Sequence, residues 1–224
     1  MNWEETFVER LASVAISNVF NPYSDRCEIY DLQDAAKIRR QNLQAVLHAR
    51  RAMKVDSIWF GRDLGYRGGR RTGLALTDEV YMFSTGVRST KAHTIARATH
   101  GSPVAERTAA VIWSVIARLA RPPMLWNAFP FHPHEPNTPF TNRAHTTRER
   151  RETAWAIEAL VERLGHPQLI AIGNDASKAL SDLGFEHVVT RHPSYGGQRE
   201  FISTMEQIHG LEPSSSKAKN PTLF

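Results

Sequence analysis

The chain has 224 residues, 41% hydrophobic and 23% charged, which fits one folded domain and offers no apolar run long enough to cross a bilayer. Its single cysteine, Cys27, excludes an internal disulfide framework and leaves no thiolate set for a zinc site or an iron–sulfur cluster. A formal net charge of +5 favours a polyanionic partner without requiring one.

The N-terminal third predicts two helices and then a strand. The stretch MNWEETFVERLASV carries acidic residues where a secretory signal would be basic, so we expect a cytoplasmic protein. Helical periodicity covers Glu4–Val14 and Ala35–Met53, with the arginines of the second helix facing solvent. VDSIWFG then predicts a buried strand that runs into the glycine- and arginine-rich stretch FGRDLGYRGGRRTG, residues 60–73.

The rest of the chain alternates between helices and short apolar strands. AERTAAVIWSVIARLA predicts a helix, PPMLWNAFP a short buried strand, and TRERRETAWAIEALVERLG a helix. PQLIAIGNDASKALSDLG predicts a strand and a helix capped by Asn174 or Asp175, and EHVVTRHPSYGGQREFISTMEQIHG a strand, a loop and a last helix. This alternation indicates an α/β fold, with a parallel sheet and helices on both faces. We expect one domain over residues 1–210 and a flexible tail over residues 211–224.

Polar side chains follow three of the predicted strands. Asp63, Asn127 and His192 each come just after a strand, so a parallel sheet would bring them to one edge. An acid that stabilises a cation, an amide that binds a planar edge and an imidazole that meets developing negative charge form a plausible reaction centre. Taken singly, each has a simpler interpretation as a turn residue, a cap or a satisfied histidine.

Spacing argues against two other interpretations of residues 60–73. The stretch lacks the Gly-Lys-Ser/Thr ending of a nucleotide-binding P-loop. Gly61, Gly65 and Gly68 do not have the spacing of a dinucleotide fingerprint either. We therefore interpret Gly61–Asp63 as the wall of an active site and residues 66–71 as a phosphate-facing or structural loop.

Three stretches together resemble the uracil-DNA glycosylase superfamily. GRDLGYRGGRRTGLALTDE, LWNAFPFHP and RHPSYGG stand in the order of its motifs, and are most similar to the bacterial branch whose first motif is GEAPGYRG-like. The resemblance spans about residues 21–201. It implies a three-layer αβα fold with a central, mainly parallel four-stranded sheet. It also implies a monofunctional DNA glycosylase that removes uracil or a related deaminated or oxidised base, the first step of base excision repair.

The resemblance assigns roles to individual positions. Asp63 falls where the classical GQDPY motif places its water-positioning aspartate, a position that the GEAPG branch fills with alanine. Asn127 falls where the family places an asparagine that binds the uracil edge, and His192 where a histidine contacts O2 of the departing base. Gly61, Arg62 and Leu76 would complete the base pocket. DNA contacts fall on two segments: Arg67, Arg70 and Arg71 in the first, and Ser194, Tyr195, Gly196, Gly197, Gln198 and Arg199 in the second. The implied partner is DNA near the nucleoid, with no membrane, metal or other cofactor.

Departures from the pattern leave other functions open. Arg62 replaces the usual Gln or Glu, Leu76 replaces the phenylalanine that stacks on uracil, and Gly65 replaces the tyrosine of uracil-selective members. A catalytically silent DNA-binding relative is therefore one alternative. A metal-dependent hydrolase that uses His132 and His134 of FHPHEP is another.

Overall fold

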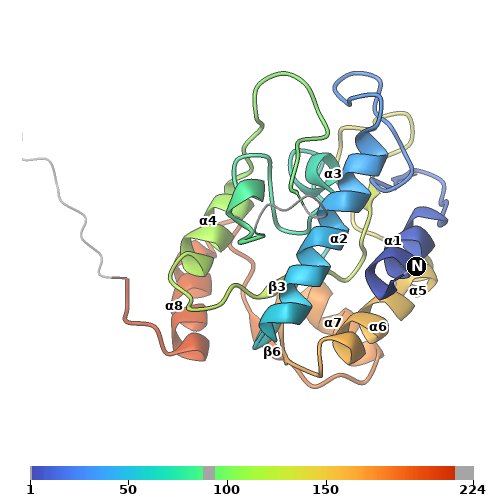
Figure 1. Cartoon of the computed structure of the whole chain (residues 1–224). Coiled ribbons are helices and arrows are strands. Elements are labelled where there is room, and N and C mark those ends of the chain that lie inside the picture. Colours follow the sequence, from blue (N-terminus) through green and yellow to red (C-terminus); the bar gives the residue numbers. More distant parts are fainter. Residues whose placement is uncertain (1, 88–93, 215–224) are drawn as a thin grey trace, which may run out of the picture.

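A parallel four-stranded sheet forms the centre of the computed structural model, which describes residues 2–87 and 94–214 (Figure 1). Its strands, in spatial order, are β3 (Met124–Asn127), β2 (Ser57–Gly61), β5 (Gln168–Ile172) and β6 (Val188–Thr190). Helices cover both faces, so the predicted three-layer α/β fold is confirmed.

The strands alternate their side chains between two apolar cores. In β2, Ile58 and Phe60 pack into one core and Trp59 into the other, and β5 repeats the alternation, with Ile170 beside Trp59. This two-residue period is the geometry of a strand buried on both faces. Because these side chains are apolar and fill the two cores, polar groups that could form a site are found beyond the strand ends. Asp63, which follows β2, is one of them.

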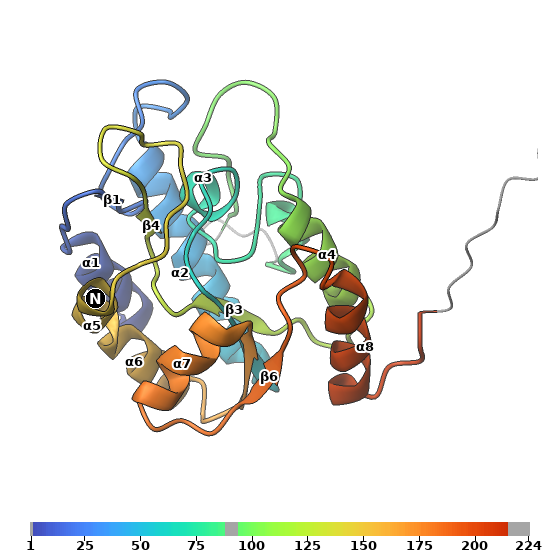
Figure 2. The same ribbon diagram turned by 180° about the vertical axis from the view of Figure 1, so that it is seen from behind.

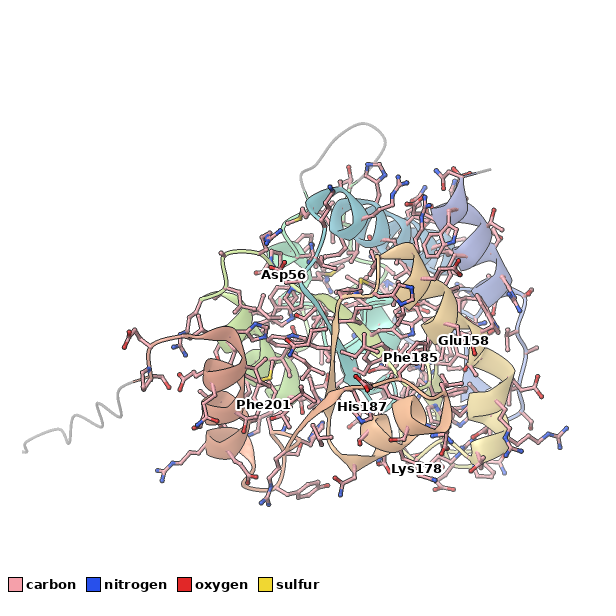
Figure 3. All side chains as sticks on the ribbon, turned by 90° about the horizontal axis from the view of Figure 1, so that it is seen from below. Asp56, Glu158, Lys178, Phe185, His187 and Phe201 are labelled. Atoms are coloured by element: carbon pink, nitrogen blue, oxygen red, sulfur yellow. The ribbon has the colours of Figure 1, made fainter. Side chains whose placement is uncertain are left out.

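Six helices supply the outer layers. The first core is covered by α1 (Trp3–Ala12), α2 (Ala35–Met53), α6 (Trp155–Arg163) and α7 (Asn174–Asp182). The second is covered by α4 (Arg107–Ile116) and α8 (Gln198–His209), which lie side by side in Figures 1 and 2. Seen from below, Phe201 of α8 and Glu158 of α6 lie on opposite sides of the strands (Figure 3).

Three details of the predicted helices are wrong. In α2, Arg39 and Arg50 are buried and do not face solvent. The helix expected over residues 147–165 is split into α5 (Thr147–Thr153) and α6, although Ala154 between them keeps helical dihedrals, φ −55° and ψ −37°. The cap of α7 is Gly173, not Asn174 or Asp175. The chain turns from β5 into α7 at φ +91°, a conformation that glycine adopts without steric cost.

Smaller elements border the sheet. Strand β1 (Val19–Phe20) pairs antiparallel with β4 (His132–Pro133), while the one-turn helix α3 (Gly69–Thr72) and the 3₁₀ turn η1 (Met82–Ser84) follow β2. None of these four was expected from the sequence. None of the helices in the described ranges combines the length and the apolar character that a membrane span requires.

The chain continues past α8 along the second core. The guanidinium of Arg118 donates to the carbonyl of Glu212, and the backbone N–H of Ser214 donates to Glu206 at 2.7 Å. The rest of the expected tail, residues 215–224, lies outside the described residues.

Candidate active site

A cavity of about 1050 Å³ opens at the carboxyl ends of the parallel strands. Its walls come from the segments that follow β2, β5 and β6, with further residues from α4 and from the segment before α5. The chain order reverses between β2 and β5, because β3 lies on one side of β2 and β5 on the other. Ligands of open α/β sheets bind at such a switch point, so the position of the cavity matches the sequence prediction.

Asp63 lies in this cavity with its side chain only 5% exposed. Its Oδ2 accepts a hydrogen bond from Nε of Arg62 at 2.5 Å, and its Oδ1 contacts Nδ1 of His145. The guanidinium of Arg62 also reaches Asp175 at 3.5 Å, at the start of α7. Burial disfavours the charge on Arg62, but the carboxylates of Asp63 and Asp175 outweigh it and raise the pKa of the guanidinium.

Asn127 ends β3 and carries a buried amide. The residue is 1% exposed, and among the described residues neither its Oδ1 nor its Nδ2 has a hydrogen-bond partner. A buried polar group left unsatisfied costs about 1–3 kcal/mol, so such groups are rare without a functional reason. The backbone holds the position firmly, because the next N–H, that of Ala128, donates to the carbonyl of Gly61 at 2.8 Å.

Gly61 and Leu76 shape the space around this amide. A Cβ atom at Gly61 would lie 2.5 Å from Oδ1 of Asn127 and 2.8 Å from Cδ2 of Leu76, so any other residue at the end of β2 would require these two side chains to move. Leu76 lines the cavity, whereas the amide beside it is covered. The backbone of Leu76 has φ +53°, a left-handed conformation that is uncommon for a branched side chain.

His192 faces the cavity from the loop after β6. Its Nδ1 accepts a hydrogen bond from the backbone N–H of Ser194 at 3.2 Å, so the proton of the neutral ring is on Nε2. Burial lowers the pKa of the imidazole, and the charge of Arg62 lowers it further. The loop is tightly packed, since a Cβ atom at Gly197 would lie 2.2 Å from the His192 carbonyl oxygen.

The remaining predicted DNA contacts of this loop lie at the mouth of the cavity or just beyond it. Ser194 and Tyr195 line the cavity, and the Tyr195 side chain is fully exposed on a backbone with φ +52°. Gly196 follows with φ +83°, and Gln198 and Arg199 are exposed in the first turn of α8. A DNA-binding role for these residues stays a prediction.

The prediction that Arg70 and Arg71 hold phosphates is wrong, because both side chains are buried in the fold. Arg70 donates to the carbonyl of Pro139 and lies 4.0 Å from the centroid of the Phe20 ring. Arg71 pairs with Glu79 at 2.9 Å. Of the three arginines only Arg67 is exposed, and its role stays a prediction.

Sequence reasoning missed two residues that bear on this site: Glu106, which lines the cavity, and His145, which contacts Asp63. His145 precedes α5 and contacts Asp63, and Glu106 precedes α4. The Glu106 carboxylate lies over the glycine-rich loop, where a Cβ at Gly65 would come within 2.7 Å and one at Gly68 within 2.0 Å. Burial and the nearby Asp78 raise the pKa of Glu106. Both come from irregular segments, where no periodicity points to a site.

The buried histidine of FHPHEP, His132, serves the fold. The buried ring of His132 uses Nε2 toward the carbonyl of Thr141 at 2.8 Å and Nδ1 toward Arg70 at 3.2 Å. Burial lowers its pKa to about 3. Throughout the described part of the chain, no group of three His, Cys, Asp or Glu residues could hold a metal ion.

The parallel β3-β2-β5-β6 sheet, with helices on both faces, is a fold that this chain shares with solved structures. Among eleven matching chains of solved structures is wild-type Pedobacter heparinus SMUG2. It matches with a TM-score of 0.58 and 12% sequence identity, covering 94% of this chain and 98% of that one. No family model matches the sequence, and no curated protein does either. The likeness therefore shows a shared fold.

Proposed function

We propose that the chain is a monofunctional DNA glycosylase that hydrolyses the N-glycosidic bond of uracil or a related deaminated or oxidised base in DNA. The observation that carries this proposal is the unsatisfied amide of Asn127, buried beside Gly61 at the edge that also holds Asp63 and His192. A donor and an acceptor side by side match the hydrogen-bonding edge of a nucleobase. The glycosylase fold supports the same reaction class.

Asp63 and His192 would each stabilise one of the two charges that develop in the reaction, positive on the sugar and negative on the departing base. When the bond between C1′ and the base nitrogen breaks, the electron pair leaves with the base and the sugar becomes oxocarbenium-like. The carboxylate of Asp63 would stabilise this cation and accept a proton from the water that bonds to C1′. Nε2–H of His192 would donate to the departing base, and a neutral ring suits this role because Nδ1 is already an acceptor.

Access to the cavity requires the nucleotide to leave the stack. The exposed ring of Tyr195 stands on a left-handed backbone at the mouth, a strained arrangement suited to inserting between bases. Arg67 and Arg199 are exposed and would contact phosphates. Leu76 lines the cavity, and both Leu76 and Asn127 lie close to Gly61, so we expect the Leu76 side chain to move when a base reaches the amide.

A catalytically silent DNA-binding protein is the second candidate, and the ion pair between Arg62 and Asp63 favours it. Nε of Arg62 donates a hydrogen bond to Oδ2 of Asp63 at 2.5 Å, so this oxygen is not available to the water of the proposed reaction. If this pair persists on DNA, the protein would bind damaged strands without hydrolysis.

A base-release assay separates the two candidates. Single-stranded and duplex oligonucleotides with one uracil, hypoxanthine, xanthine or 5-hydroxymethyluracil would be incubated with the protein, and abasic sites cleaved with alkali. We expect release at one lesion, and a loss of about 10²–10⁴-fold in Asp63→Asn and His192→Ala with DNA affinity retained. The exposed His166 gives a matched control, because His166→Asn should keep full activity. Binding without release at any lesion would favour the silent protein.

A further inference from the structure

His145 makes a direct contact with the proposed catalytic carboxylate. Its Nδ1 lies against Oδ1 of Asp63, and both side chains are nearly buried, at 7% and 5% exposure. An ionised carboxylate has only acceptors, so Nδ1 must carry the proton and donate it to Oδ1. The contact therefore fixes the tautomer of the histidine and the orientation of the carboxylate together.

The segment that carries His145 is anchored without it. Arg143 pairs with Glu149 and donates to the carbonyl of His134 at 2.9 Å, and Oδ1 of Asn142 accepts from the N–H of Tyr66 at 3.1 Å. On the other side, Thr146 caps α5 through a capping box. These neighbours already hold the segment in place, so the hydrogen bond of His145 is not needed to anchor it. We therefore infer that this hydrogen bond serves to orient Asp63.

The two oxygens of Asp63 have different partners. Oδ1 faces His145, which projects from a segment with its own anchors, whereas Oδ2 faces Arg62, whose side chain is 39% exposed and shared with Asp175. A half-exposed arginine at the mouth of a DNA-binding cavity can exchange its carboxylate for a phosphate. A buried histidine cannot leave so easily. Oδ2 is therefore the oxygen that becomes available to water, while Oδ1 stays bound.

We propose that His145 is a positioning residue that holds Oδ1 of Asp63, so that Oδ2 is aimed at the attacking water. The inference rests on the proposed glycosylase reaction and adds a residue to it. The ring of His145 also packs against that of Phe129, with 5.5 Å between the ring centroids. This packing is a structural role that experiments must distinguish from the positioning of Asp63.

Two substitutions separate the donor from the ring. His145→Asn keeps an N–H at the position of Nδ1 but loses the ring, whereas His145→Phe keeps the ring and loses the donor. Misplacing a reacting group by about 1 Å costs on the order of 100-fold in rate. We expect His145→Phe to lower the single-turnover rate of base release by about 10–100-fold with unchanged DNA affinity, and His145→Asn to recover most of it. Rates that follow the ring instead of the donor would overturn the inference.

A double-mutant cycle with Asp63→Asn tests whether His145 acts through Asp63. If it does, adding His145→Phe to Asp63→Asn should lower the residual rate no further, because the shared step is already lost. Independent, multiplicative losses would show that His145 acts elsewhere, and would contradict the inference without touching the proposed function.

Nuclear magnetic resonance of the imidazole provides a readout that needs no activity. A long-range ¹H–¹⁵N spectrum of the wild-type protein should show His145 protonated on Nδ1, with a changed pattern in Asp63→Ala. A proton on Nε2 alone in the wild type would overturn the inference even if base release occurs. Absence of base release by the wild type at every lesion would overturn the proposed function, and with it the positioning role of His145.

Discussion

At Asn127 the proposed binding of a base and the stability of the fold make opposite demands. The buried amide of Asn127 has no hydrogen-bond partner in the part of the chain that the structure describes. Asn42, also buried, donates to the carbonyls of Thr72 and Ala96 and accepts from the N–H of Ala96. We expect Asn127→Leu to raise the free energy of unfolding by about 1 kcal/mol and abolish base release. Asn42→Leu, the matched control, should lower it by about 1–3 kcal/mol. Urea unfolding measures both, and a destabilised Asn127→Leu would show that the amide serves the fold.

Among individual site residues, those that follow the ends of strands could be predicted from the sequence, whereas those in irregular segments could not. Asp63, Asn127 and His192 could be placed because an apolar strand fixes where its polar neighbour emerges, and the register of a parallel sheet brings the ends together. His145 and Glu106 come from segments without periodicity, whose paths are set by tertiary contacts such as the hydrogen bond from the N–H of Glu106 to Asp78.

The glycine- and arginine-rich loop is an element whose neighbouring arginines do different things. Charge and glycine content predicted a phosphate-facing or structural loop and did not separate its arginines. The structure does, because Arg70 and Arg71 of the single turn α3 are buried whereas Arg67 is exposed. Composition alone does not distinguish these arginines. Their surroundings in the fold differ, because Arg71 forms an ion pair with the buried Glu79 whereas Arg67 is exposed to solvent.

Two substitutions in this loop should therefore have opposite effects. Arg71→Gln leaves Glu79 buried without its nearest cation, and we expect it to lower the free energy of unfolding by about 3 kcal/mol. Arg67→Gln should change stability by less than about 0.5 kcal/mol. It should, however, reduce the slope of log Kd against log salt for an oligonucleotide by about 1. An unchanged slope would remove Arg67 from the DNA contacts.

For the whole molecule, buried histidines link stability to pH. The pKa values of His132, His192 and His209 are all lowered, chiefly by burial, so each ring is neutral in the folded state where the unfolded chain binds a proton. Their contribution is complete above pH 6.5, the ordinary histidine value, and is lost as the pH falls toward the folded pKa values. Glu106 has the opposite effect, because a raised pKa makes the folded state bind the proton first.

Between pH 6.5 and 4.5 the histidine effect is separated from that of carboxylates with lowered pKa values, such as Glu79 and Glu149, because these lose their contribution only below this window. His132, with a pKa of about 3, stays neutral in the folded state throughout. We therefore expect the wild type to lose stability on acidification, and His132→Gln to reduce that slope by about 1.4 kcal/mol per pH unit. Glu106→Gln should make the slope steeper. Urea unfolding at several pH values measures all three, and an unchanged slope in His132→Gln would show that this ring is protonated inside the fold.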